Sequence, residues 1–366
     1  MKNLNCYAVV VPGLEGIAAD ELHELAAHEV QMGDGGVAFS TSMDGLFRIN
    51  LRSRVITRIL IRLASFRALS FPELYNKSKK VAWGHYISPQ VSVSVRASCN
   101  GSKLMHSGRA EKAMLDAIAD KLGFVCTDTT DEQQVLLRID NNQCTISLDA
   151  SGDRLDRRGY RLHSGKAPVR ETIAAAILRW MDWQADEPLM TPMCGSGTFA
   201  IEAAWIAEKR AAGLTHVFPF LHWPALKEKR WQRALDKARS MQSACDFSVF
   251  ASEWEANILA QAKENAVCAG VSESIQFELL DVRKLAVPDD VSDVGLLICN
   301  PPYGERVKAD VTGLYQQLGK RFKQHFSGWR MAVIVPDKVC EKALGLPVKK
   351  RLNIKHGGKW VSVLHL

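Results

Sequence analysis

This chain of 366 residues lacks the apolar stretches that would place it in a membrane. No apolar run approaches the roughly 20 residues that a membrane-spanning helix needs. The segment Met1 to Cys6 has neither the long apolar region nor the cleavage site of a secretory signal peptide. We therefore expect a cytoplasmic protein without a membrane partner.

Cysteine patterns that bind metal are missing as well. The nine cysteines are odd in number and scattered, with no CxxC pair and no Cys/His spacing suited to zinc. Scattered thiols are typical of proteins from reducing compartments. We expect a protein without a metal, and the sequence indicates no particular oligomeric state.

Acidic residues are absent between Asp44 and Glu73, although the net charge of the whole chain is only +7. Arginines fill that interval, and two more basic clusters follow it. The three clusters are Arg48, Arg52, Arg54, Arg58, Arg62 and Arg67; Lys77, Lys79 and Lys80; and Arg154, Arg157, Arg158 and Arg161. Any one cluster could be a solvated face whose aliphatic stems cover apolar surface. Three clusters so close together favour a surface that follows the phosphates of a nucleic acid.

The first 155 residues contain short, mixed elements. Apolar runs and alternation predict strands at Cys6–Val11, Val37–Ser40, Val91–Val95, Gln134–Ile139 and Cys144–Leu148. Helical apolar spacing predicts helices at Leu14–Leu25, at Met43 to about Ile56 and at Glu111–Leu122. The mixture predicts an α+β module, and no dinucleotide or phosphate-loop fingerprint occurs in it.

A glycine turn opens the second part of the chain. After the polar stretch Ser151–Ser164, we expect an apolar helix at Thr172–Trp183 and then a strand that leads into the run Cys194-Gly195-Ser196-Gly197-Thr198. Glycines at such a turn let the backbone approach a ligand at a helix N-terminus. The turn is compatible with NAD, FAD or S-adenosylmethionine. A phosphate loop is excluded, because no GKS or GKT follows.

Two acidic residues come directly after the next predicted strands. Glu253 follows the strand Phe247–Ser252, and Asp281 follows the strand Ile275–Leu280. An acid at the end of the second strand is suited to holding both hydroxyls of a ribose, and one at the end of the third can accept a hydrogen bond from an adenine amino group. Taken separately, each could be a capping or surface carboxylate. Their order behind the glycine turn favours a nucleoside site.

The tetrapeptide Asn300-Pro301-Pro302-Tyr303 stands behind the apolar run Val294–Cys299, which reads as a buried strand. Prolines fix φ and remove backbone donors, so the loop is rigid and its carbonyls remain free to accept hydrogen bonds. An Asn side chain, a carbonyl and an aromatic ring could hold a planar group that carries an amino group. A plain proline turn is the competing interpretation. Behind it we expect a helix near Leu314–Phe322, a strand at Met331–Val335 and a hairpin of Leu352–Lys355 with Val361–Leu366.

These residues together resemble the class I S-adenosylmethionine-dependent methyltransferases that act on exocyclic amines. Longer motifs narrow the resemblance to the THUMP-domain RNA guanine-N2 methyltransferases, which include the N-terminal half of the bifunctional large-subunit rRNA enzyme and related tRNA enzymes. The motifs are Asn300–Arg306, Arg157–Arg161, Pro168–Thr172 and Pro192–Thr198, with looser matches at Phe71–Tyr75, Trp83 and Ser102–His106.

The resemblance implies a role for each matching residue. The methyl-donor loop would be Cys194, Gly195, Ser196 and Gly197, the ribose acid Glu253 and the adenine-side acid Asp281. Asn300 would belong to the donor site as well as to the catalytic loop. Thr191 stands where the family carries an acid near the donor's ammonium group, so we expect a weaker grip there through lost charge assistance. The family also carries an insertion between Gly197 and Glu253. Three tryptophans of that insertion, Trp205, Trp223 and Trp231, are expected in the core rather than as stacking platforms.

The resemblance also implies the architecture. We expect a Rossmann-like α/β methyltransferase domain at residues 186–366, with a seven-stranded sheet that ends in an antiparallel hairpin. A ferredoxin-like subdomain at residues 1–65, a THUMP-like RNA-binding domain at 66–155 and a linker with a helix at 156–185 would precede it.

The expected activity is methyl transfer from S-adenosylmethionine to the N2 amine of a guanine in structured RNA, with rRNA preferred over tRNA. Asn300 and the Pro301 carbonyl would accept the amine hydrogens, Pro302 would stiffen the loop and Tyr303 would stack on the flipped base. N6-adenine methylation of RNA or DNA, glutamine methylation of a protein, a nicotinamide-dependent oxidoreductase and a non-catalytic RNA-binding factor stay open as alternatives.

Overall fold

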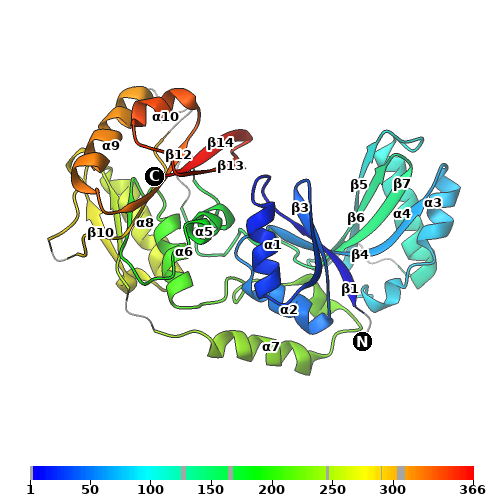
Figure 1. The fold of residues 1–366 in the computed structure, drawn as a ribbon. Helices are drawn as coiled ribbons and strands as arrows, with labels where there is room; N and C mark the ends of the chain where they lie inside the picture. The colour runs from blue at the N-terminus through cyan, green and yellow to red at the C-terminus, as the bar shows by residue number, and fades with distance from the viewer. Residues whose placement is uncertain (1–2, 125–128, 164–167, 245–246, 290, 303–309) are drawn as a thin grey trace. The chain divides into compact units, whose positions relative to one another are not determined.

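The chain forms two compact units, and neither is contiguous in sequence (Figure 1). The computed structural model describes residues 3–124, 129–163, 168–244, 247–289, 291–302 and 310–366. The first unit comprises Met1–Val10, Glu21–Leu155 and His216–Lys237, and the second comprises Val11–Asp20, Asp156–Thr215 and Ala238–Leu366. The domain bounds expected from the sequence are contiguous, and they stay a prediction.

The first unit is built on a seven-stranded sheet with the order β2-β3-β1-β4-β7-β6-β5. Its strands are β1 (Leu4–Val9), β2 (His28–Gly33), β3 (Gly36–Thr41), β4 (Arg58–Arg67), β5 (Ser92–Asn100), β6 (Glu132–Asp140) and β7 (Gln143–Asp149). Only β5 and β6 pair in parallel. The helices of this part of the chain are α1 (Glu15–Glu24), α2 (Met43–Arg52), α3 (Phe71–Ser78) and α4 (Ser107–Leu122). The predicted α+β class is therefore confirmed.

Strand β4 corrects the prediction over residues 43–67. The helix expected to reach Ile56 ends at Arg52, because Ser53 is extended and caps it through the backbone bond to Ile49. Residues Arg58–Arg67, which the sequence presented as a basic cluster, form the central strand next to β1. The sequence interpretation gave weight to the regularly spaced arginines and missed the buried apolar run Ile59, Leu60 and Ile61 between them, which is the strand signal.

Several members of the three basic clusters are paired inside the protein, so the prediction that they follow the phosphates of a nucleic acid is wrong for them. Arg58 ion-pairs with the fully buried carboxylate of Asp149. Arg158 is 4% exposed and pairs with Glu202 on α6 (Thr198–Ala207). Buried charges need such partners. Arg62, Arg67, Lys80 and Arg157 are exposed and keep the predicted character.

The second unit is built on a seven-stranded sheet with the order β10-β9-β8-β11-β12-β14-β13. The strands are β8 (Leu189–Pro192), β9 (Val249–Glu253), β10 (Ile275–Leu279), β11 (Leu296–Cys299), β12 (Arg330–Val335), β13 (Lys350–His356) and β14 (Lys359–His365). The first five in the order are parallel, and β14 runs antiparallel to β12. This is the predicted α/β sheet with its antiparallel C-terminal hairpin.

Helices cover this sheet in two groups (Figure 1). One group contains α5 (Glu171–Trp180), α6 and α8 (Ala256–Ala269); the other contains α9 (Val311–His325) and α10 (Lys338–Leu344). Tyr315, Leu318 and Phe322 of α9 pack in one apolar cluster with the strand residues Leu297 and Val333. Burial of each of these side chains stabilises the fold by about 1.5–3 kcal/mol. This packing holds the strand ends of the site in place.

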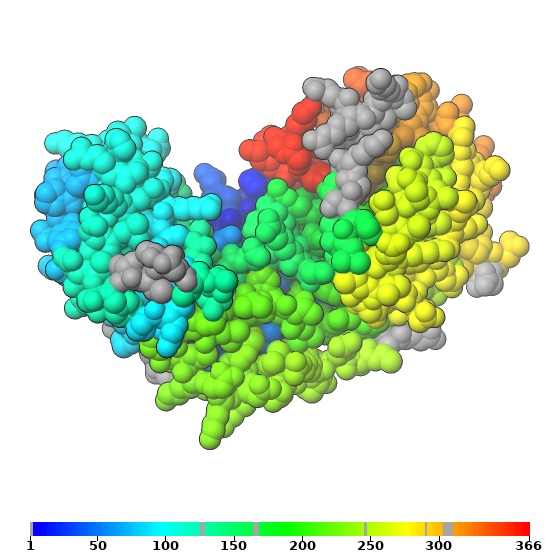
Figure 2. Space-filling view, turned by 180° about the vertical axis from the view of Figure 1, so that it is seen from behind, coloured from blue at the N-terminus to red at the C-terminus, as the bar shows by residue number. Residues whose placement is uncertain are grey.

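The hairpin of β13 and β14 turns at Gly357 and Gly358, as predicted. Their φ angles are +59° and +83°, which suits the two-residue turn that favours glycine at both positions. Figure 2 shows this hairpin, in red, on the surface of the second unit, and its Trp360 is 59% exposed.

The insertion between the glycine turn and β9 contributes to the first unit through His216–Lys237. Trp223 is 4% exposed and its Nε1 donates to Gln133 Oε1 at 2.6 Å. Trp231, on α7 (Glu228–Ser240), packs edge-on against Phe47 at a centroid distance of 5.6 Å. Trp205 is buried in the second unit, where its Nε1 donates to Ala269 O. The prediction that all three are core residues is confirmed.

Among the helices that the structure describes, none combines the length and the apolar character needed to cross a bilayer.

Candidate active site

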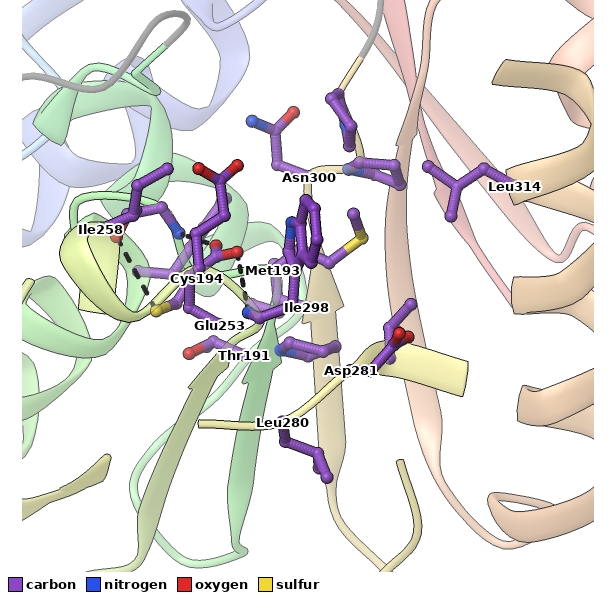
Figure 3. A pocket seen from close by; sticks show the side chains of 18 of the residues that line it. Thr191, Met193, Cys194, Glu253, Ile258, Leu280, Asp281, Ile298, Asn300 and Leu314 are labelled. Atoms are coloured by element: carbon purple, nitrogen blue, oxygen red, sulfur yellow. Dashed lines mark hydrogen bonds between the residues drawn. The ribbon is translucent and has the colours of Figure 1, made fainter. Parts of the chain in front are cut away.

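A cavity of about 610 Å³ opens at the carboxyl ends of β8, β9 and β11 in the second unit (Figure 3). Open parallel sheets bind their ligands at this edge. Nine of the eleven residues predicted for the site line it: Thr191, Cys194, Gly195, Ser196, Glu253, Asp281, Asn300, Pro301 and Pro302. Gly197 stands just behind the wall, at the start of α6. Tyr303 lies outside the described residues.

The glycine turn between β8 and α6 requires an unusual backbone. Met193, Gly195 and Gly197 have φ angles of +54°, +54° and +80°. A Cβ atom added at Gly195 would meet no atom within 4 Å, so it is the left-handed conformation, not crowding, that favours glycine there. The open space leaves the backbone of Gly195 accessible to a ligand in the cavity.

Glu253, at the end of β9, holds this turn from the neighbouring strand. Its Oε2 accepts a hydrogen bond from Gly195 N at 3.1 Å, and its Oε1 accepts one from Trp254 N at 2.9 Å. The residue is 6% exposed. Burial raises the pKa of the carboxyl above 4.5, and the backbone donors partly oppose that shift. Each oxygen still has lone pairs for ligand hydroxyls.

Asp281 is more exposed than Glu253. It caps the short turn Val282–Lys284 by accepting from Arg283 N, and its carboxylate also pairs with the Arg283 side chain. These hydrogen bonds lower the pKa of Asp281 below 3.8. The carboxylate therefore combines a capping role with its place in the cavity wall, where lone pairs remain for an amino group.

Asn300 follows the last residue of β11, and its side chain extends beyond the strand end (Figure 3). Its Oδ1 atom is buried and finds no hydrogen-bond partner among the residues that the structure describes. An unpaired buried acceptor costs about 1–3 kcal/mol, so a ligand donor is the physical explanation we favour. Pro301 is buried and Pro302 half-buried beside it.

Thr191 is 1% exposed, and its hydroxyl donates to Phe250 O at 3.3 Å. The hydroxyl proton is thus directed at the neighbouring strand β9 and leaves only oxygen lone pairs toward the cavity. The nearby thiols of Cys194 and Cys299 are neutral at physiological pH, because burial raises the pKa of each well above 9.0. Neither thiol is poised as a nucleophile.

Sequence reasoning missed the rest of the cavity wall. Trp254 and Glu255 follow Glu253 directly, and Pro168 and Val169 precede α5. Leu314 comes from α9, on the opposite side from Ile258 (Figure 3). Adjacency to Glu253 could have indicated Trp254 and Glu255. Nothing in the sequence pattern places α9 or Pro168 at the same edge as the glycine turn. No group of three or more possible metal ligands occurs within the described part of the chain.

Comparison with protein families divides the chain into three matching regions. Residues 5–60 match the RlmL ferredoxin-like domain, residues 68–149 match the THUMP domain, and residues 158–360 match the RMKL-like methyltransferase domain.

Two curated relatives align over almost the whole chain. The putative RNA methyltransferase slr0064 of Synechocystis sp. is 33% identical over 362 residues, which cover 96% of this chain and 94% of the relative. The ribosomal RNA large subunit methyltransferase K/L of Syntrophotalea carbinolica is 35% identical over 96% of this chain. This chain spans 52% of that second relative.

Solved structures agree on the fold. SMU.472, a putative methyltransferase crystallised with SAH, superposes with a TM-score of 0.92 at 26% identity and covers 100% of this chain and 98% of its own. A structure from Listeria monocytogenes, called a predicted N6-adenine-specific DNA methylase, superposes with a TM-score of 0.90 at 28% identity, over 100% of this chain and 96% of its own.

Proposed function

Because this chain belongs to the family of RNA methyltransferases that join an RlmL ferredoxin-like domain, a THUMP domain and an RMKL-like methyltransferase domain, we propose that it methylates the exocyclic N2 amine of a guanine in structured RNA. The methyl donor is S-adenosylmethionine, and ribosomal RNA is preferred over transfer RNA as the substrate. The observation that carries the proposal is the buried Oδ1 of Asn300, which has no hydrogen-bond partner among the described residues and lies at the edge of a cavity that the glycine turn also lines.

The residues around the cavity fit the donor. The cavity volume of about 610 Å³ falls in the range of small-molecule sites, roughly 300–1,000 Å³. Glu253 would accept the ribose hydroxyls, and Asp281 would accept the adenine amino group. The open face of Gly195 lets the backbone approach the donor. When bound, S-adenosylmethionine would supply an electrophilic methyl group, and S-adenosylhomocysteine would be the leaving group.

Asn300 and Pro301 would bind and orient the target amine. The Asn300 Oδ1 and the Pro301 carbonyl would accept its two hydrogens and would leave the nitrogen lone pair free for the methyl group. The same acceptors stabilise the positive charge that develops on nitrogen. A strong base is unnecessary, because the methylated nitrogen becomes acidic and loses its proton afterwards. Alignment of the two reacting atoms supplies further acceleration.

The target base reaches this site only when it is unpaired or flipped out of its helix. Tyr303, which follows Pro302, would stack on the flipped ring, a contact worth roughly 1–3 kcal/mol. Exposed basic residues of the first unit, such as Arg62, Arg67 and Lys80, hold the RNA through its phosphates and its shape.

N6-adenine methylation is the second candidate. Asn-Pro-Pro-Tyr serves both reactions, and the Listeria structure carries an N6-adenine name. The THUMP region favours RNA over DNA and over a protein substrate. An oxidoreductase would use Gly195 and Gly197 but leave Asn300 without a task. The chain spans about half of its K/L relative, so the activities of that whole protein do not carry over as a set.

The test is to incubate the protein with unmodified total RNA and labelled donor and to digest the RNA to nucleosides. Label in N2-methylguanosine is the expected result. Label in N6-methyladenosine would mean that the target base is adenine and not guanine. Calorimetry with S-adenosylmethionine is the companion measurement. Retained RNA affinity without any donor binding would identify a non-catalytic RNA-binding factor.

A further inference from the structure

The glycine turn is held from behind by Arg161, a member of the third basic cluster. Its Nη1 donates to Ser196 Oγ at 2.6 Å, and its Nη2 donates to Thr198 Oγ1 at 2.9 Å. Ser196 and Thr198 both line the cavity. A planar guanidinium makes the two contacts from two different nitrogens in a fixed fork, an arrangement that a lysine ammonium does not reproduce.

Arg161 is anchored on its other edge. Its Nε donates to Glu171 Oε1 at 2.8 Å, and Nη2 donates to Val169 O at 3.0 Å. The side chains of Arg161 and Glu171 are 15% and 7% exposed, so the ion pair is shielded from water. One guanidinium therefore connects the glycine turn to Val169, another part of the cavity wall, and to the first turn of α5.

Asn265 of α8 makes a second, independent connection. It is fully buried. Its Oδ1 accepts from Leu162 N at 2.8 Å and His163 N at 3.1 Å, and its Nδ2 donates to His163 O at 3.1 Å and Ser196 O at 3.0 Å. All four hydrogen-bonding positions of the amide are thus filled. Ser196 is held by its side chain through Arg161 and by its main chain through Asn265.

The turn needs this support because of its backbone. Three of its residues have positive φ, and one of them, Met193, carries a side chain that disfavours that conformation. A non-glycine residue in that conformation is strained and persists only where its surroundings over-determine it. Neither Arg161 nor Asn265 is among the described residues that line the cavity, so both act on a ligand only through the turn.

We propose that Arg161 and Asn265 are positioning residues of the donor site: they hold Ser196 and Thr198 in the arrangement that receives S-adenosylmethionine. Residues 161–163, which precede the donor loop by more than thirty positions in sequence, are thereby part of the donor site. The inference rests on the proposed function only in that the cavity takes this donor. It does not depend on which base is methylated.

The experiment compares Arg161→Lys and Asn265→Leu with Arg158→Lys. Arg161→Lys keeps the positive charge beside Glu171 but loses the forked guanidinium contacts. Asn265→Leu removes all four hydrogen bonds of the amide with a side chain of similar volume. Arg158→Lys is the matched control, because Arg158 belongs to the same cluster and pairs with Glu202 in a setting that is more deeply buried, with side chains 1% and 0% exposed. Calorimetry measures the affinity of each free protein for S-adenosylmethionine and S-adenosylhomocysteine.

We expect both test variants to bind the two ligands about tenfold more weakly or worse, from the loss of hydrogen bonds in a buried setting. The KM for RNA should stay within twofold of wild type, and turnover at saturating donor within threefold. The control should lose thermal stability and keep its donor affinity. Ser196→Ala should show non-additivity with Arg161→Lys in donor affinity, since the two side chains share one contact.

Wild-type affinity in both test variants would overturn the proposal, as would a loss no larger than that of Arg158→Lys. Turnover that saturating donor does not restore would also overturn it, by placing the residues in the transfer step. If Arg161→Lys does not fold, Ser196→Ala and Thr198→Val can be used instead. They remove the hydroxyl groups that accept the hydrogen bonds of Arg161, and they leave the Arg161–Glu171 pair intact. A wild-type protein that binds no donor would refute the proposed function instead.

Discussion

The backbone N–H of Gly195 donates a hydrogen bond to Oε2 of Glu253 at 3.1 Å. This bond joins the ends of two neighbouring parallel strands, β8 and β9. The proposed ribose acid therefore also helps to fix the donor loop, and its protonation state bears on both roles.

Donor binding should depend on pH through Glu253. Burial raises the pKa of its carboxyl above 4.5, so the neutral acid stabilises the free protein below that value, and this contribution is lost as the pH rises through the raised pKa. Ribose hydroxyls donate to the ionised form, so donor affinity should fall as the pH drops through the same range. Calorimetry between pH 5 and 8 on wild type and Glu253→Gln checks this, and the variant should bind weakly with a flatter profile. An identical slope in both proteins would remove Glu253 from the titration.

Asn300→Ala should reduce methyl transfer by more than tenfold, because the acceptor that orients the amine and meets its developing charge is lost. Donor affinity should stay within threefold of wild type. Asn300→Asp is the matched control, since it keeps an acceptor oxygen at the same place, and it should retain more activity than Asn300→Ala. Single-turnover transfer to RNA measures both, and activity within tenfold of wild type in the alanine variant would disprove the role.

Thr191→Asp should tighten donor binding by about tenfold. The carboxylate would add charge assistance to the contact with the donor's ammonium group, which the hydroxyl, directed at Phe250 O, does not give. The free variant should melt at a lower temperature, because an unpaired buried carboxylate is costly. Calorimetry and thermal melts together check the pair of effects. Weaker donor binding would show that the ammonium group does not lie beside this residue.

RNA affinity should fall steeply with salt, because phosphate contacts release counterions. The logarithm of the binding constant should decline linearly with the logarithm of salt concentration, and Arg67→Gln should lower the slope by about 1 if Arg67 contacts a phosphate. Donor affinity of the same samples serves as the control and should change little. A flat salt response would refute the phosphate-binding surface.

Trp223→Ala should destabilise the first unit by about 3–5 kcal/mol, the usual cost of truncating a buried tryptophan. The residue lies in sequence between the glycine turn and Glu253, yet its Nε1 bonds to Gln133 of β6. Thermal unfolding should therefore shift while donor binding at low temperature is kept. Trp360→Ala, at a position that is 59% exposed, should leave the melting temperature within about a degree. Loss of donor affinity in Trp223→Ala would contradict the assignment of this segment to the first unit.

Much of the site could be predicted because it follows strand ends. Glycine, acid, acid and Asn-Pro-Pro come one after another along the chain, each behind an apolar run, and parallel strands bring their carboxyl ends to one edge. The periodicity of apolar residues and the turn residues that end each run are enough to indicate such elements. The arginine clusters were less informative, since the sequence pattern of an exposed arginine is the same as that of one paired inside the protein. Burial decided between them: Arg62 is exposed, and Arg158 is not.

The sequence by itself determined the two mixed α/β parts, the order of the donor and acceptor motifs and the residues Gly195, Glu253 and Asn300 of the candidate site. Those features depend on local periodicity and on short motifs. Only the tertiary structure decided that Arg161 and Asn265 hold Ser196, and that His216–Lys237 completes the other unit. Contacts between distant segments are chosen by the packing and hydrogen bonding of the whole fold, which no local pattern encodes.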